Sequence, residues 1–290
     1  DSLSIRRPVI GTVETLNAIN AQQLRAYYET HYRPERSIIV MTGDFDVAAM
    51  EAKIKNVFGD WTNDTAAPPD PDDGMTTHAG LMAKVYDDDE LTPSISLIDA
   101  RKPSYKMDST ASRRASFVRG YANAIVNQRI RKKLLEADAK VRSASVSYAV
   151  RDTGDLAYAS SSAKDDDWKS ALEIVDAEIR RALQYGFQQA EYDELMANSK
   201  RGLIDSANYA AKRRSGSLAG GIMGSFASSS VRVTPQYRLE SFEANAADIP
   251  LSELEAEFNK MWQDFEPQIW LESPKVEDVT PEDVLASYQT

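Results

Sequence analysis

The sequence predicts an α+β fold, in which a layer of long helices lies on an antiparallel sheet. Two observations predict it. Short segments of alternating polarity occur in pairs, and long segments with helical spacing of apolar residues follow them. In addition, a helix, a proline break and a short extended segment occur twice in the same order, over residues 19–44 and 249–273. Such an internal repeat indicates that one architectural unit is present more than once.

The repeat is defined by matched apolar positions and matched breaks. Laying Ile19 on Ile249 brings these further residues together at helical spacing: Leu24 with Leu254, Ala26 with Ala256, Tyr28 with Phe258 and Tyr32 with Trp262. A proline then ends each helix, because it lacks an N–H and restricts the residue before it. Strands are predicted at 37–42 and 268–271, and a capped helix is expected after each.

The remaining elements lie between the two copies. Predicted strands are 81–86, 94–100, 144–150 and 156–160, and predicted helices are 109–137, 168–185, 191–214 and 235–247. The third and fourth strands are separated by a short turn at 152–154, which predicts a hairpin. Gly186 is expected to end the helix before it.

Composition bounds the class of protein. A chain of 290 residues that is 42% hydrophobic suits one large domain or two ordinary ones. No apolar run approaches the length of about 18 residues that a membrane span requires, and the absence of cysteine excludes disulfides and thiolate metal sites. A net charge of −11 argues against nucleic acid as a partner. A cleft with acidic walls would instead attract basic peptides. The simpler interpretation is that the negative charge only keeps the protein soluble.

The domain organisation follows from a proline-rich and acidic stretch. We expect a linker over 63–80, which separates a first piece, residues 1–62, from a module over 81–272. Residues 273–290 are expected to lead to a further module. Because two helices around one strand cannot bury both faces of that strand, the first piece is predicted to close a module whose opening part lies upstream of Asp1.

Two other patterns invite functional interpretations that the sequence does not favour. The glycines within 215–230 suggest a phosphate loop, but the preceding strand and the required lysine are missing, so a weak helix end or a loop is expected. The acidic runs 87–90 and 165–167 lack the alternating ligand spacing of a calcium loop. Helix capping and solvation explain them.

Several short stretches, taken together, resemble the pitrilysin/insulinase family of zinc metallopeptidases. They are residues 7–11, 31–34, 42–44 and 57–61 in the first piece, and 127–130 and 186–195 in the second. The resemblance implies repeated α+β modules of the pitrilysin or processing-peptidase type that close around a chamber. It further implies that a peptide enters as an added strand and is cut at a zinc ion in the first module.

The zinc-binding residues of that family are missing from this chain. The family holds zinc with H-x-x-E-H on one helix, where two imidazoles bind the metal and the glutamate activates a bound water. The only histidines here, His31 and His78, lie far apart and are expected at the surface. We therefore predict no catalytic residue, no metal ligand and no bound cofactor in this chain, and we expect the zinc in the upstream part of the parent protein.

One pair of candidate substrate-binding residues comes from the resemblance. Arg6 and Arg7 precede a loop that, in the family, runs near the chamber, so they are candidates for contact with substrate or with the next module. A solvated basic pair is the simpler interpretation. The glutamate, aspartate and lysine clusters elsewhere give no further candidate.

The functional hypothesis is a noncatalytic middle portion of a zinc peptidase, inactive alone, which forms chamber wall and a peptide-binding surface. Its expected partners are a peptide or small protein substrate and other modules of the same chain, with no nucleic acid and no membrane span. The alternative is a catalytically inactive scaffold or partner subunit of a peptidase homologue, and an unrelated binding module remains if the repeat is accidental. The resemblance and the lack of cysteine suggest the periplasm or cell envelope of a bacterium.

Overall fold

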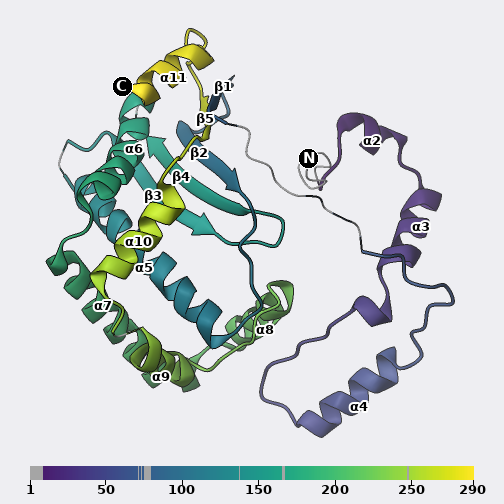
Figure 1. Cartoon of the computed structure of the whole chain (residues 1–290). Coiled ribbons are helices and arrows are strands. Elements are labelled where there is room, and N and C mark those ends of the chain that lie inside the picture. Colours follow the sequence, from purple (N-terminus) through teal and green to yellow (C-terminus); the bar gives the residue numbers. More distant parts are fainter. Residues whose placement is uncertain are drawn as a thin grey trace. The chain divides into compact units, whose positions relative to one another are not determined.

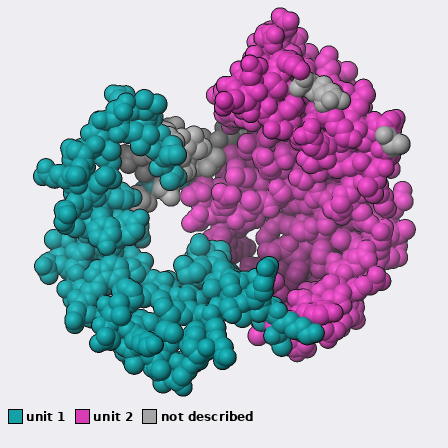
Figure 2. Space-filling view, turned by 180° about the vertical axis from the view of Figure 1, so that it is seen from behind, with its two compact units in different colours: residues 1–74, 211–232 teal, residues 75–210, 233–290 magenta. Residues whose placement is uncertain are grey.

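The computed structural model describes residues 9–70, 72, 74, 80–136, 138–164, 167–246 and 248–290. The chain divides into two compact units, shown in different colours in Figure 2. Unit 1 contains Asp1–Gly74 and Ala211–Arg232, and unit 2 contains Met75–Ala210 and Val233–Thr290. The predicted α+β class is confirmed, since unit 2 combines one sheet with a layer of long helices (Figure 1).

The sheet of unit 2 has five strands in the order β1-β5-β2-β4-β3. The strands are β1 (Met82–Asp87), β2 (Ser94–Arg101), β3 (Val141–Ala149), β4 (Asp155–Ala163) and β5 (Gln268–Ser273). Strands β3 and β4 form the predicted hairpin, and β2 pairs antiparallel with both β4 and β5. Among the described strands, only β1 and β5 run parallel, and β5 lies between β1 and β2 in the sheet. Strands β1 and β3 therefore form the two edges.

Helices pack on the sheet through its buried side chains. They are α5 (Thr110–Leu134), α6 (Trp168–Tyr185), α7 (Gln189–Asn208), α9 (Pro235–Asn245), α10 (Leu251–Trp262) and α11 (Pro281–Gln289). Helix α5 packs against β3, α6 against β4, and α10 against both helices, while α7 pairs with α9 (Figure 1). Side chains of β4 alternate between buried and half-buried along its whole length. This period of two shows that the helices cover one face of the sheet.

The core is closed by aromatic side chains of α10. Phe258 and Trp262 are fully buried, and burial of such side chains contributes about 1.5–3 kcal/mol each. The indole Nε1 of Trp262 donates to Oδ1 of Asn123 on α5 at 2.9 Å, so the polar atom of this ring is satisfied. Helix α5 starts at a capping box between Ser109 and Ser112, as its predicted start requires.

An arginine clamp joins α5 to the start of α7. Nε and Nη2 of Arg129 donate to the two carboxylate oxygens of Glu191 at 2.7 and 2.6 Å, and Nη2 also donates to the Gly186 carbonyl at 3.0 Å. The guanidinium lies 5.5 Å from the ring centre of Phe187. The two motif segments of the second piece, 127–130 and 186–195, are thus held together by one bidentate ion pair.

Replacement of Gly186, at the turn beside this clamp, would strain the backbone and would require the Glu255 side chain to shift. The φ of Gly186 is +66°, and a Cβ added there would lie 2.4 Å from Oε1 of Glu255. The same Glu255 oxygen accepts from the Phe187 N–H at 2.9 Å. The predicted helix end at this glycine is therefore correct, and its reason is both conformational and steric.

Burial by itself would raise the pKa of Glu191. Hydrogen bonds from Arg129 and from the Gln188 N–H outweigh that effect and hold the pKa below its ordinary value of 4.5. The carboxylate thus stays ionised while it is paired in the folded protein.

Unit 1 contains helices without a sheet among its described residues. They are α2 (Val13–Ala18), α3 (Ala21–His31), the short helix η1 (Pro34–Arg36), α4 (Val47–Phe58) and α8 (Ser215–Ala227). Its one buried residue in the described range is Arg33, which donates to Glu35 and to Thr65. Helix α8 corrects the expectation of a weak helix end or loop over 215–230, since its four glycines lie inside a continuous helix.

The predicted strand at 37–42 is wrong for this structure. The segment forms no ladder in the described chain, and Ile38, Ile39 and Met41 are 44–48% exposed. A strand requires a neighbour that accepts and donates its backbone hydrogen bonds, and no described segment of unit 1 supplies one. The matching segment of the second copy, β5, has neighbours on both sides.

The end of the chain packs on the second module. Helix α11 contacts β1 and α6 and buries Val284 and Tyr288. That residues 273–290 lead to a further module stays a prediction. The linker expected over 63–80 includes residues 71, 73 and 75–79, which lie outside the described residues. Asp165 and Asp166 also lie outside them, whereas Asp167 caps α6 by accepting from the Ser170 N–H at 3.1 Å.

Arg129→Ala should lower the free energy of unfolding by about 2–3 kcal/mol, because it leaves the Glu191 carboxylate without its partner. Urea unfolding measures the change, and Arg131→Ala on the exposed face of α5 is the matched control, with an expected loss below about 1 kcal/mol.

The Arg129 effect should depend on pH. A carboxylate whose folded pKa is depressed contributes stability above its unfolded pKa and loses it as the pH falls through the folded pKa. The difference between wild type and Arg129→Ala should therefore shrink below pH 4.5. An equal difference at pH 3 and pH 7 would contradict the ion pair.

Candidate functional site

The free edge of β3 is the first part of the candidate site. In an antiparallel pair, residues alternate between directing both backbone groups toward the partner strand and directing both away from it. Val146 directs its N–H and C=O away from β4, since both are taken by a side chain of α5. In the regular register of β3 with β4, Ala144 and Tyr148 lie two residues from Val146 and direct their own N–H and C=O groups to the same free edge.

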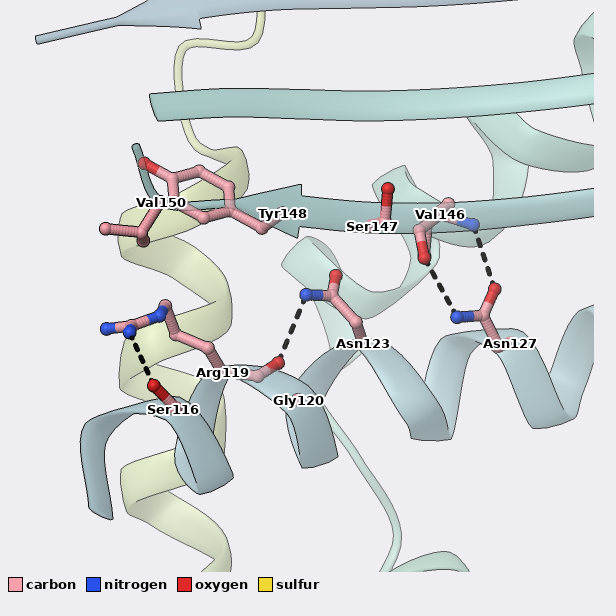
Figure 3. A pocket seen from close by; sticks show the side chains of 9 residues that line it. All are labelled: Ser116, Arg119, Gly120, Asn123, Asn127, Val146, Ser147, Tyr148 and Val150. Atoms are coloured by element: carbon pink, nitrogen blue, oxygen red, sulfur yellow. Dashed lines mark hydrogen bonds between the residues drawn. The ribbon is translucent and has the colours of Figure 1, made fainter. Parts of the chain in front are cut away.

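Asn127 is the side chain that reaches this edge. Its Nδ2 donates to the Val146 carbonyl at 2.9 Å, and its Oδ1 accepts from the Val146 N–H at 2.8 Å. Figure 3 shows the carboxamide of Asn127 facing the backbone of Val146, while the Ser147 side chain points away from α5. A single carboxamide thus presents the same donor and acceptor as a residue of a neighbouring strand.

A cavity of about 430 Å³ opens beside this contact, between α5 and β3. It is lined by Ser116, Arg119, Gly120, Asn123, Asn127, Val146, Ser147, Tyr148 and Val150 (Figure 3). The five lining residues from α5 lie at positions i, i+3, i+4, i+7 and i+11, so the helix presents all of them on one face. Gly120 widens the cavity, because nothing lies within 4 Å of the position where a Cβ would stand.

Polar contacts hold the floor of this cavity in place. Asn123 accepts from Trp262 and donates through Nδ2 to the Arg119 carbonyl at 3.1 Å, so its amide is fixed from two sides. Nη2 of Arg119 donates to Oγ of Ser116 at 3.1 Å. A Glu257 carboxylate oxygen lies 3.7 Å from Nη1 of Arg119, too far for a hydrogen bond.

Tyr148 lines the cavity, and the buried carboxylate of Asp155 holds its hydroxyl in place. Its hydroxyl donates to Oδ2 of Asp155 at 3.2 Å, and Asp155 also accepts from the N–H and the hydroxyl of Ser104 at 3.1 and 2.5 Å. Burial, followed by the nearby charge of Asp155, raises the pKa of Tyr148 from 10.0 to about 12. The tyrosine is therefore a neutral donor throughout the physiological range.

The residues around the cavity offer hydrogen-bond donors and acceptors beside open space. No group of three or more His, Cys, Asp or Glu side chains that could hold a metal ion occurs within the described ranges. His31 is exposed in the last turn of α3, with its ring centre 4.5 Å from that of Tyr27. His78 lies outside the described residues, as do Arg6 and Arg7, so the proposed role of that arginine pair stays a prediction.

The residues that build this site were not identified as a site from the sequence. Asn127 stood inside a motif segment, but nothing in the sequence indicated that its amide would meet β3. Arg119 and Tyr148 carry no motif. The signal that could have suggested the group is the recurrence of polar or small residues on one face of α5 next to an edge strand.

A ¹³C NMR titration of the tyrosine rings should give Tyr148 a midpoint of about 12. The raised folded pKa contributes stability below pH 10 that is lost as the pH rises through the folded value. In Asp155→Asn, which removes the carboxylate charge, the midpoint should move down toward 10.0. A wild-type midpoint near 10 would show that the ring is not buried against Asp155.

Comparison with known proteins places the chain in a family. The profile described as "Peptidase M16 inactive domain" matches residues 18–199. An uncharacterized zinc protease of Mycobacterium leprae is 36% identical over 55 residues, which cover 19% of this chain and 12% of that protein. No helix in the described part of the chain is long and apolar enough to cross a membrane.

Solved structures agree in fold. The periplasmic protease PqqL from Escherichia coli matches with a TM-score of 0.83 and 17% identity, over 99% of this chain and 32% of that one. A predicted insulinase family protease from Yersinia pestis matches with a TM-score of 0.76 and 17% identity, over 93% of this chain and 59% of that one. This chain thus spans only part of each relative. The resemblance drawn from the sequence is confirmed, and the chain belongs to the peptidase M16 inactive-domain family.

Proposed function

We propose that this chain is a noncatalytic part of a zinc-dependent peptidase, in which it forms chamber wall and binds the peptide substrate. In this proposal, an extended peptide adds to the free edge of β3 and places a side chain in the adjoining cavity. The observation that carries the proposal is the edge of β3 beside a cavity of about 430 Å³. Backbone pairing supplies affinity in this mode, and pockets for alternate side chains supply selectivity.

The other sheet edge is a weaker candidate. Helix α11 packs against β1, and Lys84 on that strand lies over the Trp270 ring at 4.9 Å. Charged side chains and covering helices are common devices that discourage pairing at an edge. Strand β3 is the longer of the two, with nine residues against six in β1, and a cavity adjoins it.

The catalytic metal of the proposed parent does not fit this chain. Zinc needs closely spaced imidazole or carboxylate ligands, and the sequence holds two histidines with no H-x-x-E-H motif. The proposal therefore assigns the metal and the bond cleavage to a preceding module, and it assigns binding to the residues described above. The net charge of −11 favours basic peptides as ligands.

Unit 1 is proposed to be the closing part of that preceding module. Leu254, Phe258 and Trp262 are at most 1% exposed in unit 2, whereas the residues matched to them in the repeat are 54–59% exposed: Leu24, Tyr28 and Tyr32. The same pattern of side chains is thus core in one copy and surface in the other. Strands that flank residues 37–42 as β1 and β2 flank β5 would bury them.

The periplasm or envelope of a bacterium is the proposed setting, supported by the likeness to a periplasmic protease of Escherichia coli. Further partners in the proposal are the other modules of the same protein. In the alternative of an inactive scaffold or partner subunit, no module of the parent would hold zinc, and the protein would act by binding an active homologue or by presenting peptide.

A fluorescent ten-residue peptide of alternating valine and serine, with lysine at each end, should bind the 290-residue chain saturably in an anisotropy titration. The matched control peptide carries proline at two central positions, which removes N–H donors that a ladder requires. It should bind at least about tenfold more weakly, the equivalent of losing one or two net hydrogen bonds. Equal binding of both peptides, or of neither, would contradict strand addition.

Hydrogen exchange tests the proposal for unit 1. Amides of residues 38–42 should exchange at nearly the rate of an unstructured peptide, because they have no ladder among the described residues. The Ser37 amide is excepted, because it donates to the Pro34 carbonyl at 3.1 Å. Amides of β5, Gln268–Ser273, should be strongly protected, since that strand lies between two others. Strong protection at 38–42 would mean that this segment already has a partner and that the module is not open.

A further inference from the structure

We infer that Asn127 is a built-in occupant of the β3 edge, which an incoming peptide must displace in order to pair with Val146. The inference rests on the proposed function, because it concerns how peptide gains access to the same edge. The two hydrogen bonds between the Asn127 carboxamide and Val146, at 2.9 and 2.8 Å, carry it.

The two bonds use up the pairing capacity of Val146. A residue has one backbone N–H and one C=O, and an added antiparallel strand would bond both of them at this position. Asn127 already bonds both, so the carboxamide and a peptide residue compete for the same two atoms. Ala144 and Tyr148, on either side, face the same edge, which makes Val146 the centre of any pairing that spans the three.

Displacement does not require α5 to move. Four residues before Asn127, Asn123 is bound to Trp262, and two residues after it, Arg129 is clamped to Glu191. These anchors hold the helix on both sides of Asn127. The side chain of Asn127 itself lines the cavity (Figure 3). Rotation about its χ1 and χ2 bonds can therefore move the carboxamide into open space.

The contact between Asn127 and Val146 makes the β3 edge favour long extended peptides over short ones. A short peptide that pairs only near Tyr148 would leave Asn127 in place and gain no bonds at Val146. An extended segment that spans Ala144 to Tyr148 gains bonds on both sides of Val146 and can offset the two that Asn127 loses. The same contact protects the edge when no peptide is present, since an unpaired edge invites pairing with other chains.

The test compares Asn127→Ala with wild type in the full 290-residue chain, with the valine–serine peptide as the probe. Without the competing carboxamide, peptide affinity should rise about tenfold. Asn245→Ala is the matched control, because Asn245 donates within its own helix to the Ser241 carbonyl at 3.0 Å and lies in α9. Its affinity should equal that of wild type.

Hydrogen exchange at the Val146 amide gives a second readout that a loss of stability alone would not produce. In Asn127→Ala without peptide, this amide should exchange faster while the amides of β4 keep their protection, and saturating peptide should restore its protection.

The outcomes separate the inference from the function on which it rests. If wild type binds the peptide and Asn127→Ala binds it equally or more weakly, the inference is overturned and strand addition stands. If neither protein binds the peptide although both are folded, the proposed function fails and the inference fails with it. Tighter binding by Asn127→Ala together with restored protection at Val146 supports both.

Discussion

Every backbone N–H and C=O in a sheet needs a partner, and this constraint governs both units of the chain. In unit 2, β5 satisfies it between β1 and β2, and the aromatic residues Phe258 and Trp262 of α10 are buried in the same unit. At β3, one side of the strand has no neighbour among the described strands, and the Asn127 side chain partners the centre of that edge. In unit 1, residues 37–42 form no ladder with any described segment, and the helices that precede and follow them in sequence keep apolar residues exposed.

The position of α5 links the core to the candidate site. Arg129 clamps the helix to the start of α7, and Asn123 ties it to the buried ring of Trp262. Between these two anchors the helix presents Asn127 to Val146 and Arg119 to the cavity. Arg129 and Glu191, which lie in the motif segments 127–130 and 186–195, therefore hold α5 in place. The contact of Asn127 with the β3 edge depends on them. Binding would occur where the scaffold is rigid and the Asn127 side chain has space to rotate away from Val146.

Much of the fold could be predicted because local patterns determine it. Helical spacing located α5, α6 and α10, the turn at 152–154 located the β3–β4 hairpin, and Gly186 located a helix end. Tertiary contacts decided the rest. The parallel pairing of β5 with β1, the burial of Tyr288 and the unpaired segment 37–42 depend on which neighbours are present. The candidate site was missed because the role of Asn127 arises from a contact across 19 residues of sequence that no motif encodes.

The central claim is that peptide enters as an added strand at β3. The most direct measurement is an amide NMR titration of the chain with the valine–serine peptide, together with intermolecular contacts between the two backbones. The account predicts shifts concentrated at Ala144, Val146 and Tyr148, with contacts from the peptide to these residues and none to β1. Shifts confined to β1, or spread over the surface without contacts to β3, would contradict it.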